Sequence, residues 1–362
     1  MQVTDFITPQ QQGGRKFAIL SPYLVPREMQ SKRINLGDGF ILEAIQRLLG
    51  PFSQGSVQTS RVTPTDRIRH SLSERRAIIL GGANQLSDRF SPWPSLTAAE
   101  IRRSSLVFVP MGVGMNGEPQ QNRGLTPETQ DILRAIHERI EYSSWRCPRT
   151  VRLLEEAMPD LKGQFLMTGC PVIYDHPILL QQPFHDRQES VAVTVTERGD
   201  FWEREATTLR EVARLFPKAR KFMVLHQDFR KLRSGIGPLV RAILPAGVFG
   251  DVGRLHGIAR KLGYTIVNPR SAKSAIEFYS GIDLHVGSRL HAHLLFLSRS
   301  KRSFLTYVDD RCMGFADFLK FPVIDPANLE HGLDFDFTIV QKNAVATFDT
   351  MRRFITSLEA LK

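Results

Sequence analysis

Two kinds of hydrophobic pattern alternate along the chain. Short unbroken apolar runs occur in KFAILSPYLV (16–25), RAIILGGANQL (76–86) and SLVFVPMGVGM (105–115), and such runs are typical of strands that are buried on both faces. Apolar positions recur at helical spacing in GFILEAIQRLL (39–49) and TPETQDILRAIHERI (126–140). Strands that alternate with amphipathic helices predict an α/β protein with parallel sheets.

A polar, proline-containing stretch, DHPILLQQPFHDRQES (175–190), interrupts this pattern, and the alternation then restarts. We interpret the stretch as an interdomain linker. The chain of 362 residues is long enough for two cores. The predicted fold is α/β, with two doubly wound Rossmann-like domains that face a cleft. The expected parts are an N-terminal domain (1–178) on the acceptor side, a C-terminal domain (188–340), and a C-terminal helix (341–362) that packs back on the first domain.

The composition narrows the classes of partner. A net charge of +11 favours anionic ligands, yet the basic residues are scattered and no base-reading motif is present, so nucleic acid is not expected. Three cysteines fit a reducing compartment. The sequence has no signal peptide and no apolar run long enough to span a bilayer, so we expect a cytoplasmic protein. The excess positive charge is compatible with peripheral association at the inner face of a membrane.

The stretch GSRLHAHLLFL (287–297) carries the strongest chemical signal. The strand-like IDLHV precedes it, Gly287 turns the chain, and Ser288 is placed to cap a helix that carries Arg289 and His291 in its first turn. A helix start offers unpaired N–H groups and partial positive charge to an anion. The pattern therefore predicts a phosphate or carboxylate site, in which His291 can transfer a proton near neutral pH.

Other charged residues follow predicted strands of the second half. Arg198 follows the strand-like part of VTVTERGD, and Arg311 follows two aspartates in TYVDDRCMGF. Because ligands bind at the carboxyl ends of parallel strands, we expect both arginines to join Arg289 around one anion. The aspartates either orient the arginines or hold a metal, and a metal is the weaker hypothesis because no further carboxylates accompany them. His226 ends another strand and is a candidate for the same cleft.

Familiar nucleotide-binding and hydrolase motifs are missing. The turn GVGMNG (112–117) has glycines at the G-x-G-x-x-G spacing, but no acidic residue suitably beyond it completes a dinucleotide-binding unit, so NAD is not expected. Neither a P-loop nor a G-x-S-x-G nucleophile elbow is present. No cofactor and no metal is predicted.

Several of these segments together resemble the polysaccharide pyruvyltransferase family. DLHVGSRLHAHLLFL followed by TYVDDRCMGFADFL resembles its C-terminal signature, in which R-L-H-A opens a helix. NLGDGFILEAI resembles its N-terminal Asn-x-Gly-Asp helix entry, and IILGGANQLSD and VPMGVGM resemble its two glycine turns. Three departures occur: Arg311 stands where many members have lysine, SSWRCPRT replaces the usual Arg-Asp-x-x-Ser-like stretch, and the second glycine turn lacks the usual following proline.

The resemblance implies a GT-B-like enzyme that transfers pyruvate from phosphoenolpyruvate to a sugar of a polysaccharide or glycan precursor, forming a pyruvate ketal with release of phosphate. Phosphoenolpyruvate is then the donor substrate, and a sugar or lipid-linked oligosaccharide is the acceptor. It implies His291 and Arg311 as catalytic residues. The residues implied to bind phosphoenolpyruvate are Arg198, Ser288, Arg289 and Leu290, and the candidates for the acceptor side or the cleft are Asn35, Asp38, Gly82 and His226.

Two alternatives stay open at this point. The same architecture serves nucleotide-sugar glycosyltransferases, in which the helix start would bind a diphosphate. A non-catalytic member that binds anionic glycan would use the same positive charge without releasing phosphate.

Overall fold

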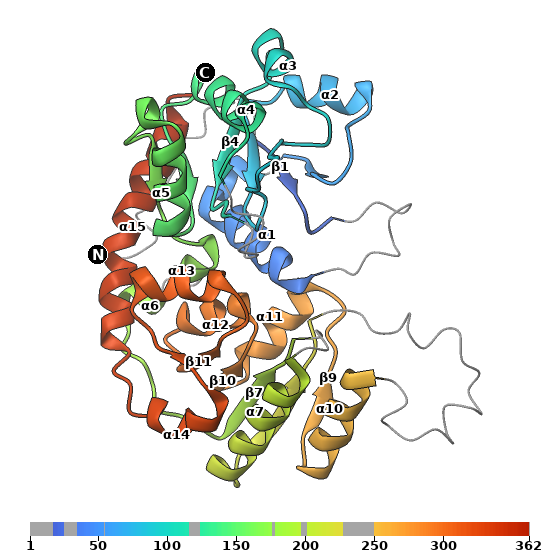
Figure 1. Cartoon of the computed structure of the whole chain (residues 1–362), viewed down its shortest axis with the longest axis vertical. Coiled ribbons are helices and arrows are strands. Elements are labelled where there is room, and N and C mark those ends of the chain that lie inside the picture. The colour runs from blue at the N-terminus through green and yellow to red at the C-terminus, as the bar shows by residue number, and fades with distance from the viewer. Residues whose placement is uncertain are drawn as a thin grey trace, which may run out of the picture.

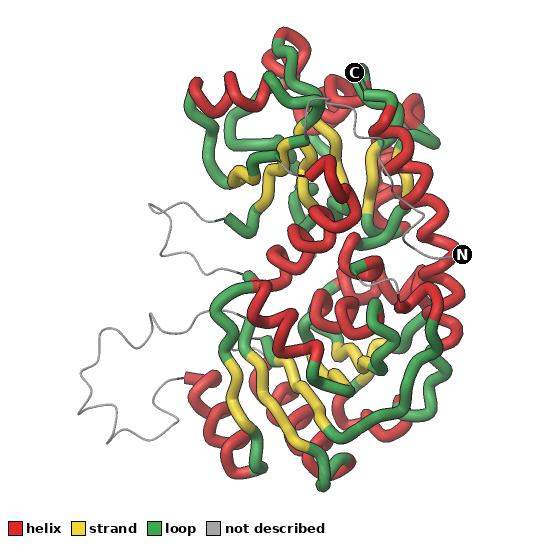
Figure 2. Tube along the Cα trace, turned by 180° about the vertical axis from the view of Figure 1, so that it is seen from behind, coloured by secondary structure: helices red, strands yellow, loops and turns green. Residues whose placement is uncertain are grey.

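The computed structural model describes residues 17–24, 35–53, 55–115, 124–175, 178–196, 201–226 and 250–361. Two parallel sheets lie one above the other along the long axis of the molecule, each between layers of helices (Figures 1 and 2). The α/β architecture predicted from the alternating pattern is confirmed. None of the helices within these ranges is both long and apolar enough to cross a membrane.

The first sheet has the strand order β2–β1–β3–β4. Its strands are β1 (Ala18–Ser21), β2 (Val57–Thr59), β3 (Ile78–Gly81) and β4 (Phe108–Met111). A bridge between Val113 and Trp145 connects it to a small parallel sheet of β5 (Ser143–Trp145) and β6 (Phe165–Met167). The helices of this half are α1 (Leu36–Leu49), α2 (Asp66–Ser73), α3 (Ala98–Arg103), α4 (Pro127–His137), α5 (Pro148–Ala157) and α6 (Ile178–Gln181).

The second sheet has six parallel strands in the order β12–β11–β10–β7–β8–β9. They are β7 (Ser190–Thr194), β8 (Arg220–Val224), β9 (Thr265–Val267), β10 (Leu284–Gly287), β11 (Ser303–Thr306) and β12 (Val323–Ile324). This is the doubly wound order of a dinucleotide-binding fold, and the winding reverses between β7 and β10. The helices are α7 (Trp202–Leu215), α10 (Gly250–Lys261), α11 (Ala272–Ser280), α12 (Leu290–Leu297), α13 (Asp310–Leu319), α14 (Leu329–Gly332) and α15 (Thr338–Glu359).

The two halves are in direct contact. Helix α1 of the first half packs against α11 and α12 of the second. The long helix α15 runs along one side of the molecule and returns from the second half to pack against β5 and β6 of the first (Figure 1). The reversal points of both sheets therefore lie near the contact between α1 and α12.

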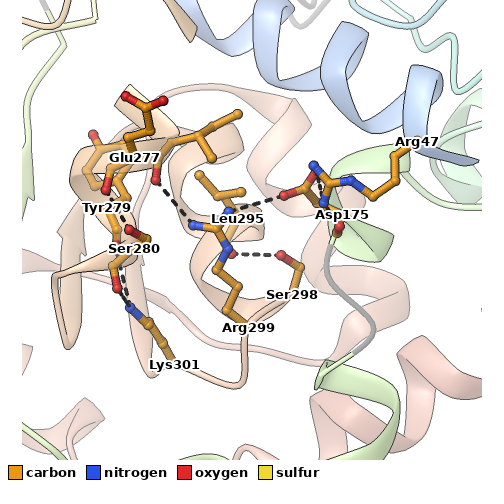
Figure 3. A network of polar contacts seen from close by, with 10 residues as sticks. Arg47, Asp175, Glu277, Tyr279, Ser280, Leu295, Ser298, Arg299 and Lys301 are labelled. Carbon is orange, nitrogen blue, oxygen red and sulfur yellow. Dashed lines mark hydrogen bonds and ion pairs between the residues drawn. The ribbon is translucent and has the colours of Figure 1, made fainter. Parts of the chain in front are cut away.

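The buried carboxylate of Asp175 pairs with arginines from both halves of the molecule (Figure 3). Asp175, just beyond the 3₁₀ turn η6 (Pro171–Tyr174), is 1 % exposed. Its Oδ1 lies 2.9 Å from Nη1 of Arg47 near the end of α1, and its Oδ2 lies 3.4 Å from Nη2 of Arg299 just after α12. Nearby, the Lys301 ammonium donates to the carbonyls of Tyr279, Ser280 and Ile282 at the end of α11 (Figure 3).

We expect Asp175→Asn to lower the free energy of unfolding by about 2 kcal/mol, because hydrogen bonds between charged buried groups contribute more than neutral ones. Urea unfolding of the variant and the wild type measures the difference. Asp349→Asn is the matched control, since Asp349 forms an exposed pair with Arg352 and its loss should change stability by less than about 0.5 kcal/mol. Equal effects of the two substitutions would contradict the linking role of Asp175.

Candidate functional site

Helix α12 and the strand before it position Arg289 and His291. The predicted strand, turn and helix are confirmed as β10 and α12, but Ser288 does not cap the helix. Arg289 is the N-cap residue, and the Ser288 hydroxyl instead donates to Glu205 at 2.7 Å. The Arg289 backbone N–H donates to Thr194 Oγ1 at 3.3 Å, and its Nε donates to the Val195 carbonyl at 3.0 Å. Arg289 is thereby fixed at the reversal point of the second sheet.

The N-terminus of α1 faces His291 from the other half. A Cβ placed on Gly37 would lie 2.5 Å from His291 Nδ1, so only glycine lets the helix approach the imidazole this closely. Asn35 caps α1 by accepting from the Gly37 N–H at 3.1 Å, whereas Asp38 lies in the first turn. Because α1 begins at Leu36, Asp38 lies inside the helix, and its carboxylate is left for contacts with other elements.

His291 is buried and its Nε2 has no hydrogen-bond partner among the described residues. Burial lowers its pKa well below the ordinary value, and the charges of Arg146 and Arg311 lower it further. The imidazole is therefore neutral at pH 7 in this structure. An anion bound among these arginines would offset their charge and raise the pKa again.

Arg311 lies in the first turn of α13, and its charge acts on His291. Asp309 caps α13 and holds the guanidinium, with Arg311 Nε 2.8 Å from its Oδ1. Burial opposes the charge of Arg311, but its hydrogen bonds to Asp309, together with the electrostatic effects of Asp309, Cys312 and Asp38, raise its pKa. This aspartate thus orients an arginine, and the described residues contain no group of three His, Cys, Asp or Glu side chains placed to hold a metal.

A third arginine was missed by sequence reasoning. Arg146 follows the short strand β5 and is 1 % exposed. Its Nη2 donates to Asn84 Oδ1 and to the Met115 carbonyl, while its Nη1 has no hydrogen-bond partner within the described residues. A Cβ on Gly114 would collide with its guanidinium, which explains glycine at that position. The sequence signal that could have identified Arg146 is its position directly after a strand, the same signal that pointed to Arg289 and Arg311.

Asp38 is the acidic group facing this positive charge from α1. Burial raises its pKa to about 6, although Arg61, Arg311 and Arg146 act in the opposite direction. Its Oδ2 is 4.0 Å from Arg61, and its Oδ1 accepts from Asn35 at 3.3 Å. Asp38 therefore interacts with the same two arginines, Arg146 and Arg311, that surround His291.

The remaining residues predicted for the site are His226, Gly82, Leu290 and Arg198. His226 is buried against Phe40, and its Nε2 is 2.6 Å from the Tyr279 hydroxyl. Burial lowers the pKa of His226 to about 3, so it is neutral. Gly82 has φ +63° and would place a Cβ 2.2 Å from Ile41, so it serves close packing of α1. Leu290 is buried in the first turn of α12. Arg198 lies outside the described residues.

The structure thus gathers three arginines, Arg146, Arg289 and Arg311, around His291; we call this group the arginine cluster. Burial and the charge of Arg311 lower the pKa of Arg289 to about 9, which still leaves it charged at neutral pH. Buried positive charge of this density is stabilised best by an anion that accepts from several guanidinium groups. The arrangement can bind a phosphate or carboxylate beside a neutral imidazole and a partly buried carboxylic acid.

Comparison of folds gives the class of protein. The chain is similar to a putative UDP-N-acetylglucosamine 2-epimerase from Listeria monocytogenes, with TM-score 0.54 and 10 % identity over 96 % of each chain. It is similar to the S. aureus MnaA structure with UDP, with TM-score 0.52 and 9 % identity over 96 % of this chain and 98 % of that one. These likenesses identify a GT-B-like fold of the type found in glycosyltransferases and sugar epimerases. No curated protein sequence matches the chain significantly.

The family follows from the sequence profile of polysaccharide pyruvyl transferases, which matches residues 35–309. The chain belongs to this family and is a transferase. The matched region begins at the cap of α1 and ends at the cap of α13, so it contains Asp38 and all of the arginine cluster except Arg311, which lies two residues beyond it.

Proposed function

We propose that the protein transfers pyruvate from phosphoenolpyruvate to a pair of hydroxyl groups on a sugar, releasing phosphate and forming a cyclic ketal. The observation that carries this proposal is the arginine cluster around an imidazole whose Nε2 has no partner in the described part of the chain. Phosphoenolpyruvate presents a phosphate and a carboxylate, and two anionic groups need several forked donors. The N–H groups at the start of α12 add to them.

The reaction needs one proton donor at the donor substrate and one proton acceptor at the sugar. Protonation of the methylene carbon C3 leaves a cationic centre at C2, which a sugar hydroxyl attacks as it loses its proton. The C2–O bond to phosphate breaks, and a second hydroxyl adds to C2 and loses its own proton. One proton is consumed at C3, two are released, and the phosphate leaves with its electron pair.

We assign the two proton transfers to His291 and Asp38. Burial is the main cause of the lowered pKa of His291, and an anionic donor substrate would offset the smaller effect of the neighbouring arginines, which favours delivery of a proton from the imidazole to C3. Asp38, on α1, comes from the half of the molecule expected to hold the acceptor, and its carboxylate accepts the hydroxyl proton. The arginines stabilise the negative charge of the departing phosphate.

We expect kcat/KM for the acceptor to fall as the pH drops through about 6, the raised pKa of Asp38, because a protonated carboxyl accepts no proton. Asp38→Asn should lower the rate about 10²-fold and flatten this acidic limb. Rates of phosphate release between pH 5 and 8 test this, with Asp66→Asn, an exposed acid on α2, as control. An unchanged acidic limb in Asp38→Asn would remove Asp38 from the reaction.

The proposed function itself is tested by incubating the protein with phosphoenolpyruvate and a panel of aryl glycosides. The expected result is phosphate release together with a product of increased mass, detected by mass spectrometry as a ketal. Thermal protection by phosphoenolpyruvate and none by UDP- or GDP-sugars supports the proposal. Protection by a nucleotide sugar alone would point to a glycosyltransferase, and binding of phosphoenolpyruvate without phosphate release would point to a non-catalytic glycan-binding protein.

A further inference from the structure

A buried acid, Glu205, spans the reversal point of the second sheet. It lies in the first turns of α7 and is 0 % exposed. Its Oε1 accepts from the Thr196 backbone N–H at 2.8 Å and from the Ser288 hydroxyl at 2.7 Å. Thr196 follows β7 and Ser288 follows β10, so one carboxyl oxygen connects the carboxyl ends of the two central strands.

The ends of β7 and β10 lie side by side at the base of Arg289. Gly287 pairs with Thr194, and with φ +141° it leaves no room for a side chain, since a Cβ would lie 2.1 Å from the Thr194 carbonyl oxygen. The Ser288 N–H donates to that same carbonyl at 3.1 Å. From α7, Glu205 adds a side-chain hydrogen bond to Ser288, the residue immediately before Arg289, which is the N-cap of α12.

Keeping this acid buried costs folding free energy. Its second oxygen, Oε2, has no hydrogen-bond partner among the residues that the structure describes. Burial raises the pKa of Glu205 to about 7, against the opposing effects of Ser288, Thr196 and Arg204. An apolar side chain would fill the same space at lower cost, and uncompensated buried polar groups of this kind concentrate at functional sites.

We propose that Glu205 is a positioning residue for the anionic donor substrate: by holding Ser288 and Thr196 together, it fixes the direction in which Arg289 reaches toward His291. This inference rests on the proposed function for the identity of the donor.

The test compares Glu205→Leu, which removes both accepted hydrogen bonds, with Glu205→Gln, whose carbonyl oxygen can still accept them. Phosphoenolpyruvate and inorganic phosphate are the two probes, and calorimetry measures their affinity. Loss of the two contacts should weaken phosphoenolpyruvate binding about tenfold in Glu205→Leu, while Glu205→Gln stays within about twofold of wild type. In turnover, KM for phosphoenolpyruvate should rise while kcat changes less than about twofold.

Two further variants test whether the effect of Glu205→Leu on affinity comes from its contact with Ser288. Glu203→Leu is the matched control, because Glu203 is exposed on the same helix and should leave affinity unchanged. Ser288→Ala removes the partner rather than the acid and should weaken binding in the same direction, with little added loss when combined with Glu205→Leu. If Glu205→Leu does not fold, Ser288→Ala and Glu205→Gln still report on the contact.

The possible outcomes separate the two proposals. Wild-type affinity for both probes in Glu205→Leu overturns the positioning role, and so does a fall in melting temperature with unchanged affinity. Binding of phosphate but not phosphoenolpyruvate by the wild type, with weaker phosphate binding in Glu205→Leu, supports Glu205 and contradicts the donor assignment. Failure of the wild type to bind either probe overturns both.

Discussion

Replacing His291 with glutamine is expected to lower kcat by about 10²–10⁴-fold, the range that a positioned proton-transfer group contributes. The affinity for phosphoenolpyruvate should change little, because the arginine cluster supplies the charge that holds the donor. The imidazole is suited to this role by its place: its Nε2 has no partner within the described ranges, and α1 closes on its other face through Gly37. Glutamine preserves a polar side chain of similar reach but moves no proton at neutral pH.

Single-turnover phosphate release measures kcat for His291→Gln, and calorimetry measures donor affinity. His331→Gln is the control, since His331 is an exposed histidine on α14. Normal turnover in His291→Gln would exclude the residue from the mechanism. A loss of donor affinity as large as the loss of kcat would instead make His291 a binding residue.

The pattern of apolar runs predicted most of the strands and helices that position the site. The run before Gly287 and the helical spacing after it predicted β10 and α12, and the parallel arrangement placed Arg289 and Arg311 at one edge of a sheet. The family profile extends this agreement to the N-terminal entry at Asn35. The local sequence pattern predicted the positions of Arg289 and Arg311 because each follows closely after a strong apolar run.

Residues held by tertiary contacts could not be predicted in this way. Arg146 follows a strand of only three residues, and its burial depends on Gly114 and Phe315 from distant parts of the chain. Glu205 lies in the first turns of α7, and its role depends on contacts with Thr196 and Ser288, which follow two different strands. The sequence immediately around Arg146 and Glu205 does not distinguish them from ordinary charged residues on the surface.

The N-caps of α1 and α12 show the same limit of prediction from the local sequence. Ser288 and Asp38 both have side chains that favour an N-cap, yet Arg289 and Asn35 occupy those positions. Ser288 is engaged by Glu205, and Asp38 is drawn toward arginines from other elements. At α12 the tertiary partner of Ser288 therefore outweighs local preference, whereas at α1 the cap Asn35 is itself a favoured residue and lies three positions before Asp38.

Arg289→Ala should weaken phosphoenolpyruvate binding at least about a hundredfold, or about 3 kcal/mol, because a buried charge that pairs with an anion is lost. Its Nε is already committed to the Val195 carbonyl, which fixes the plane of the guanidinium and reduces the entropy lost when a ligand binds. Arg289→Lys keeps the charge but loses the fork and this anchoring contact, and we expect an intermediate loss of about tenfold. Calorimetry with phosphoenolpyruvate distinguishes the three proteins.

The control is Arg210→Ala, an exposed arginine on α7 of the same half of the molecule, which tests whether net positive charge alone attracts the donor. Raising the salt concentration should reduce the affinity of all variants by similar factors, because long-range attraction is screened while the contacts of the arginine cluster are short. If Arg210→Ala and Arg289→Ala weakened binding equally, the donor would be attracted by overall charge rather than by a fixed site at the reversal point of the second sheet.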